Sequence, residues 1–129
     1  MLKVYLKDCL PDFVGELERL LLEEDRPELA CQVRDMPVDV GRCVIGGGFC
    51  AMLCTGLQPS KGWGAGQTTI ALAPKQGNIL VDVIDGEIIA VEVFCRKDVY
   101  ERMVQMQYVY AQPGNASESV SWGGGPLAG

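Results

Sequence analysis

Two carboxylates, Asp82 and Glu92, interrupt the most apolar segment of this 129-residue sequence, NILVDVIDGEIIAVEVFC at positions 78–95. Carboxyl groups among aliphatic side chains can act as general acids or bases. The Asp85-Gly86 pair between them is typical of a two-residue type I′ turn, so the segment predicts a β-hairpin. Such a turn pairs Ile79 with Glu92 and places Asp82 on the other face. The two carboxylates then cannot share a substrate, and we expect edge or interface charges at both positions.

The sequence contains no histidine, which excludes histidine-assisted nucleophilic catalysis and most zinc and non-haem iron sites. The cysteines include no C-x-x-C pair, and we expect them to be reduced, buried, small apolar residues. We therefore expect no metal ion, no cofactor and no catalytic residue. An enzyme that uses carboxylate or cysteine chemistry is the function that these residues support least. The six cysteines are Cys9, Cys31, Cys43, Cys50, Cys54 and Cys95.

A glycine-rich segment at positions 42–56, RCVIGGGFCAMLCTG, follows the G-x-G-x-x-A pattern at Gly46, Gly48 and Ala51. VIGGGFCA resembles the opening of flavin- and nicotinamide-dependent Rossmann proteins, and the resemblance implies a dinucleotide site. Positions 62–70, however, offer no acidic residue for a ribose, and the chain is too short for the second half of such a domain. The alternative interpretation is a long buried strand with a glycine bulge.

The loop at positions 59–67, PSKGWGAGQ, is rich in glycine and carries one tryptophan. Loops of this kind can cover a ligand or anchor a contact, although a tryptophan can also fold back onto the core. If the chain has a small-molecule pocket, we expect it between the sheet and this loop, with Lys61, Trp63 and Gln67 as ligand-binding residues together with Asp82 and Glu92. A small-molecule-binding protein is therefore an alternative function.

Acidic residues accumulate where a helix predicted to start at Pro11 should end. Glu23, Glu24 and Asp25 place negative charge at the negative end of the helix dipole, which predicts either a solvated face or an acidic patch for a basic partner. The tail at positions 113–129 is rich in glycine and serine, and we expect it to be flexible, with Trp122 available to dock on a partner.

Both faces of the predicted hairpin are mainly apolar, which predicts either burial on both sides or contact with another copy of the chain. In VDVIDGEIIAVEVF, Gly86, Ile88 and residues 90–94 resemble the hairpin of a short uncharacterised bacterial family, a domain of unknown function. That family has Gly where this sequence has Ala90. The resemblance covers positions 81–94 and implies no activity.

Eleven basic and 17 acidic residues give a net charge of −6, which disfavours nucleic-acid and anionic-membrane surfaces. Without a signal segment or an apolar span, we expect a cytoplasmic protein whose chain starts near Met1. The hairpin resemblance implies a bacterial one.

Periodicity predicts strands at 2–7, 29–34 and 68–73, helices from 11 and from 96, and either helix or strand at 104–110. The fold class that follows is a single α+β domain at 1–112, with an antiparallel or mixed sheet that could curl toward a barrel. The favoured function is a non-enzymatic, self-associating interaction module whose acidic surface suits a basic or neutral protein.

Overall fold

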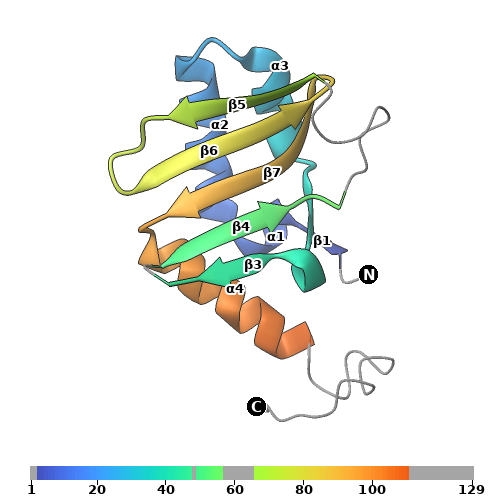
Figure 1. Cartoon of the computed structure of the whole chain (residues 1–129), viewed down its shortest axis with the longest axis vertical. Coiled ribbons are helices and arrows are strands. Elements are labelled where there is room, and N and C mark those ends of the chain that lie inside the picture. Colours follow the sequence, from blue (N-terminus) through green and yellow to red (C-terminus); the bar gives the residue numbers. More distant parts are fainter. Residues whose placement is uncertain (1–2, 48, 57–65, 111–129) are drawn as a thin grey trace.

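The computed structural model describes residues 3–47, 49–56 and 66–110, which combine helices with antiparallel sheets (Figure 1). The predicted α+β class is therefore confirmed. The predicted tail at 113–129 lies outside the described residues. In chain order, the elements are β1 (Lys3–Tyr5), α1 (Leu6–Cys9), α2 (Pro11–Glu23), α3 (Pro27–Val33), β2 (Pro37–Asp39), the 3-10 turn η1 (Val40–Arg42), β3 (Val44–Gly46), β4 (Cys50–Cys54), β5 (Gln67–Leu72), β6 (Asn78–Ile84), β7 (Glu87–Phe94) and α4 (Lys97–Tyr110).

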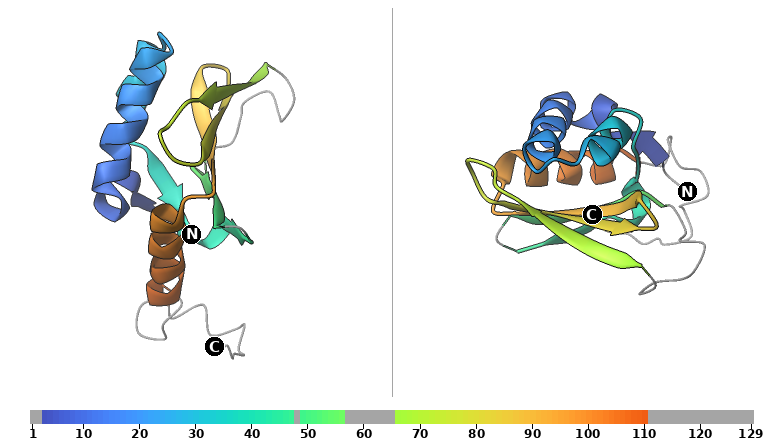
Figure 2. Two further views of the ribbon diagram at one scale, coloured as in Figure 1. Left: turned by 90° about the vertical axis from the view of Figure 1, so that its left-hand side faces the viewer. Right: turned by 90° about the horizontal axis from the view of Figure 1, so that it is seen from above.

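The main sheet has five antiparallel strands in the order β3-β4-β7-β6-β5, and β1 pairs with β2 in a separate two-stranded sheet. The described α-helices all lie on one side of the main sheet (Figure 2). Its outer strands, β3 and β5, lie at opposite ends of the strand order, so the described strands form an open sheet and not a closed barrel. The molecule thus consists of one sheet layer and one helix layer.

Helix α2 forms as predicted, because its buried side chains follow helical spacing and Pro11 occupies its first turn. Its end is a Schellman motif: Arg26 N donates to Leu21 O at 2.9 Å, and Asp25 N donates to Leu22 O at 3.0 Å. Asp25 has the left-handed φ of 58° that this motif requires. The acidic end of α2 is therefore also the point at which the chain turns into α3.

The strand predicted at 29–34 is wrong, because α3 covers most of it. The buried residues Leu29, Ala30 and Val33 have helical spacing, and Pro27 starts the helix. The strand predicted at 2–7 is shortened, since β1 ends at Tyr5 and α1 follows at once. Residues 104–110, for which the sequence allowed either helix or strand, belong to helix α4.

The glycine-rich segment forms neither of the predicted structures. Gly46 ends β3, and Cys50 already begins β4, which pairs with β3 antiparallel. A dinucleotide-binding turn needs a helix after the glycines, and here a strand follows. Phe49 adopts a left-handed φ of 55° in this turn and packs edge-on against Tyr100 at 5.3 Å between ring centroids. The segment is therefore a hairpin that is anchored on α4.

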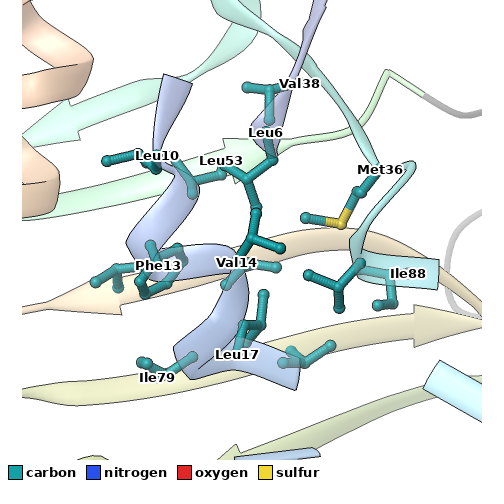
Figure 3. Packing of buried hydrophobic residues seen from close by; sticks show 14 of the residues in the cluster. Leu6, Leu10, Phe13, Val14, Leu17, Met36, Val38, Leu53, Ile79 and Ile88 are labelled. Carbon is teal, nitrogen blue, oxygen red and sulfur yellow. The ribbon is translucent and has the colours of Figure 1, made fainter. Parts of the chain in front are cut away.

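The core lies between the helices and the inner face of the main sheet (Figure 3). Leu17 and Leu53 have no exposed surface. Burial of each such side chain stabilises the fold by about 1.5–3 kcal/mol relative to its exposure to water. The residues labelled in Figure 3 show how the α1–α2 segment and the segment leading into and through β2 meet the main sheet: Leu6, Leu10, Phe13, Val14, Leu17, Met36, Val38, Leu53, Ile79 and Ile88.

Candidate functional site: the open face of the main sheet

The β6–β7 hairpin contains an irregularity that sequence reasoning missed. After the turn, Val83 pairs with Ile88, but Asp82 pairs with Ala90, so Ile89 is an extra residue on β7. Beyond this bulge Leu80 pairs with Glu92. The prediction that Asp82 and Glu92 lie on opposite faces is therefore wrong.

Two distant side chains hold the bulge in place. The amide of Gln32, from α3, donates to Gly86 O at 2.7 Å and accepts from Ile88 N at 3.0 Å. Thr55, after β4, donates from its backbone N and its hydroxyl to Ile89 O, both at 3.0 Å. Because these bonds satisfy backbone groups that a regular ladder would have paired, the extra residue is stabilised.

The register separates the two faces of the sheet. Ile79, Val81 and Val91 belong to the core with the helices, so their neighbours along each strand point to the opposite side. We call this side the open face. Two rows of paired residues cross it from β4 to β5: Met52, Glu92, Leu80 and Ala71 form one row, and Cys54, Ala90, Asp82 and Thr69 form the next.

The carboxyl groups of Asp82 and Glu92 interact across neighbouring rows. Asp82 is only 6% exposed, and the hydroxyl of Thr69 donates to its Oδ1 at 2.8 Å. A hydrogen bond with Asp82, then burial and the negative charge of Asp82, raise the pKa of Glu92 to about 7. A bond between two carboxyl groups requires a proton, and Glu92 holds this proton below neutral pH and loses it above.

The open face around this carboxyl pair is mixed: polar Gln67, Thr69 and Asn78 are exposed on it, and Asp82 itself is buried. Met52, Leu80 and Phe94 are half-buried, although no described helix lies on this side of the sheet (Figure 2). The face therefore combines aliphatic and aromatic surface with one titratable centre. Such a surface can pack against another apolar surface, provided that the carboxyl pair keeps its proton.

The other predicted ligand residues are not brought together by the described structure. Gln67 is exposed at the start of β5, on the same face as Thr69 and opposite Ile84. Lys61, Trp63 and Trp122 lie outside the described residues, so the predicted pocket under the loop stays a prediction.

The predicted acidic patch lies at the end of α2, where Glu23, Glu24 and Asp25 are all exposed. Glu23 accepts from Arg19 at 2.9 Å, one helical turn earlier. The patch is therefore partly neutralised, and Glu24 and Asp25 carry most of its remaining charge.

A groove of about 590 Å³ lies elsewhere, between α2 and the β5–β6 turn, and Arg96 forms part of its wall. Arg96 is 7% exposed and donates to both oxygens of Glu16 at 2.8 and 2.9 Å, twice to Asp98 at 3.0 Å, and to Gln76 O at 3.4 Å. These contacts raise the pKa of Arg96 and lower that of Asp98. Because the five N–H donors of the guanidinium are used, Arg96 joins α2 to α4 and has none left for an anion.

The cysteines differ from the prediction that all are buried. Cys9 and Cys43 are buried, whereas Cys31 and Cys95 are exposed. Burial raises the pKa of Cys9, and it raises that of Cys43 to about 11. Among the described residues, no group of three or more Cys, Asp or Glu side chains is arranged to hold a metal ion.

Comparison with known proteins adds no assignment: no family model matches the chain, and neither a curated protein nor a solved structure is significantly similar to it. Within residues 3–47, 49–56 and 66–110, no helix has the length and apolar character needed to cross a membrane.

Proposed function

We propose that this chain is a non-enzymatic interaction module that self-associates through the open face of its main sheet. The observation that carries the proposal is the one-sided covering of the sheet: the described helices lie on one face, and the other presents Met52, Leu80 and Phe94 half-buried. Antiparallel sheets with one solvated face normally expose polar residues there. Here polar Gln67, Thr69 and Asn78 are exposed, and the apolar strip of Met52, Leu80 and Phe94 beside them is typical of a surface that meets another protein.

Charge supports a second copy of the chain as the occupant. Asp82 and Glu92 are the two ionisable carboxyl groups in the crossing rows of the open face, and they share a proton below neutral pH. Each face then carries one negative charge fewer than after ionisation of Glu92, which lowers the repulsion between two copies, whereas a cationic partner would favour loss of the proton.

The area of the open face determines how stable a dimer we expect. Five strands about 4.8 Å apart and about six residues long form a face of roughly 24 by 20 Å, or about 480 Å². Stable interfaces bury about 800 Å² on each partner. We therefore expect a reversible, concentration-dependent dimer and not an obligate one.

The test is light scattering of the full chain over a range of concentrations, with Leu80→Arg on the open face and Val104→Arg as the matched control. Val104 is 41% exposed on α4. We expect the native chain and the control to form dimers and Leu80→Arg to stay monomeric with an unchanged circular dichroism spectrum. A native chain that is monomeric throughout, or equal association of both variants, would refute the proposal.

Acid–base catalysis is a second candidate, because the bulge brings Asp82 and Glu92 together. A shared proton and a Glu92 pKa of about 7 suit a general acid or base at neutral pH. The groove lined by Arg96 lies outside this face, which disfavours the idea. A panel of ester and glycoside substrates tests it: turnover that Glu92→Gln abolishes would support catalysis, and absence of turnover would count against it.

A further inference from the structure

The outer edge of β5 is a second surface that the open-face proposal does not use. Among the described strands, β5 pairs with β6 alone and lies at the end of the sheet order. Its outward-facing N–H and C=O groups can therefore pair with another extended chain.

Within the described strand β5 itself, the sequence devices that usually prevent such pairing are absent. The β5 sequence, QTTIAL, contains no charge and no proline, and its six residues pair with β6 in unbroken register from Gln67 to Leu72. Natural edge strands are commonly protected by Lys, Pro, bulges or short length. β5 has none of these, so it is the strand best suited to accept a partner.

The surroundings of the edge are acidic. The junction between α2 and α3 reaches past β5 in the helix layer (Figures 1 and 2), and it carries Glu23, Glu24 and Asp25 beside Leu22, which is 58% exposed. Exposed Asp85 and Glu87 lie near the N-terminal end of β5, because Gln67 pairs with Ile84 at the start of the hairpin turn.

The basic groups nearby are fewer. Arg19 bonds to Glu23 at 2.9 Å, Arg26 lies 3.7 Å from Glu28, and Lys75 is exposed beyond the other end of β5. With Glu28 included, the segments flanking β5 carry six carboxylates against three cations, counting only described residues. These described groups therefore carry a net charge of −3, which favours a basic partner.

We propose that the β5 edge accepts an extended, basic segment of a partner protein as an added β-strand. Backbone pairing along β5 supplies affinity, and the acidic α2–α3 junction favours Lys or Arg in the bound segment.

A second copy of this chain is the less suitable occupant. Two-fold pairing of two β5 strands in one sheet would place both helix layers on the same side, with the two α2–α3 junctions facing each other. Glu24 and Asp25 of each copy would then oppose like charges. A single strand avoids this, because it brings no helix layer with it.

The experiment is fluorescence anisotropy of the full chain with labelled peptides of about nine residues. One alternates Lys with Val, a second alternates Glu with Val, and a third is the Lys peptide with N-methyl groups on alternate residues, which block backbone pairing. We expect the Lys peptide to bind at least about tenfold more tightly than either of the others.

Two charge-reversal variants locate the site. Glu24→Lys adds positive charge beside the β5 edge, and Asp8→Lys makes the same change on α1, where Asp8 is exposed. We expect Glu24→Lys to weaken binding of the Lys peptide about three- to tenfold at low salt and Asp8→Lys to change it less than about twofold. Equal binding of the N-methylated peptide, equal effects of the two variants, or no binding of the Lys peptide would overturn the proposal.

The two proposals concern different surfaces and can fail separately. Leu80→Arg should remove self-association on the open face and leave binding of the Lys peptide to β5 unchanged. If Leu80→Arg abolishes both, the peptide occupies the open face and the β5 proposal is wrong.

Discussion

Glu92→Gln should remove a pH dependence of stability that the carboxyl pair creates. The pKa of Glu92 is raised from 4.5 to about 7 in the folded protein, so the folded state holds its proton more tightly than the unfolded chain does. The resulting stabilisation is complete below about pH 4.5 and is lost as the pH rises through about 7.

The magnitude follows from that difference. Each unit of pKa difference corresponds to about 1.4 kcal/mol, so the loss of unfolding free energy would reach about 3.4 kcal/mol if Glu92 were fully shielded from water. Glu92 is half-buried, and water screens its interaction with Asp82, so we expect about 1–2 kcal/mol. For a chain of this size, that corresponds to roughly 3–8 °C in melting temperature.

The assay is urea unfolding of the native chain and Glu92→Gln at about pH 5 and about pH 8.5, with Glu101→Gln on α4 as the control. Glu101 is exposed and pairs with Lys97 at 3.8 Å. From about pH 5 to about pH 8.5, the free energy of unfolding of the native chain should fall by about 1–2 kcal/mol more than that of Glu92→Gln. The control should show the same fall as the native chain. If the free energy of unfolding changes equally with pH in all three proteins, the interaction between Asp82 and Glu92 is refuted.

Further changes probe the parts of the fold that support the site. A Cβ at Gly77 would overlap the carbonyl oxygen at the end of β7, and its φ is 71°, so Gly77→Ala should lower the free energy of unfolding by about 2–4 kcal/mol. Gly15→Ala, in α2 with open space around it, should raise it by about 0.5–1 kcal/mol; equal effects would contradict the turn geometry. Arg96→Met should cost about 1–3 kcal/mol by chemical denaturation, because it leaves Glu16 and the more exposed Asp98 without their partner; an unchanged stability would contradict the role of Arg96 in joining α2 to α4. In native protein, a thiol reagent should modify exposed Cys31 long before buried Cys43, whose pKa is about 11; equal rates would contradict the burial.

Local patterns predicted the elements that are decided by nearby residues. The Asp85-Gly86 turn and the two apolar runs beside it predicted the hairpin, and Pro11 with the apolar seam predicted α2. The segment at 29–34 was misread because its alternation also fits a short helix. The position of Pro27 decided the outcome, since proline starts a helix readily at its first turn.

The candidate site could not be predicted from the hairpin alone. Asp82 and Glu92 were identified as unusual, but their placement on one face depends on the extra residue Ile89. That bulge depends on Gln32 and Thr55, which lie tens of residues away in the chain. A strand pairing read from one hairpin contains no information about such distant hydrogen-bond partners.

The most direct test of self-association through the open face is sedimentation of the native chain and Glu92→Gln at about pH 6 and about pH 8. Ionisation of Glu92 would place extra negative charge in the interface of each copy. The native dimer should therefore weaken at least about tenfold at the higher pH, whereas the dimer of Glu92→Gln should be unchanged. Equal association of both proteins at both pH values, or no association of the native chain, would contradict the proposal.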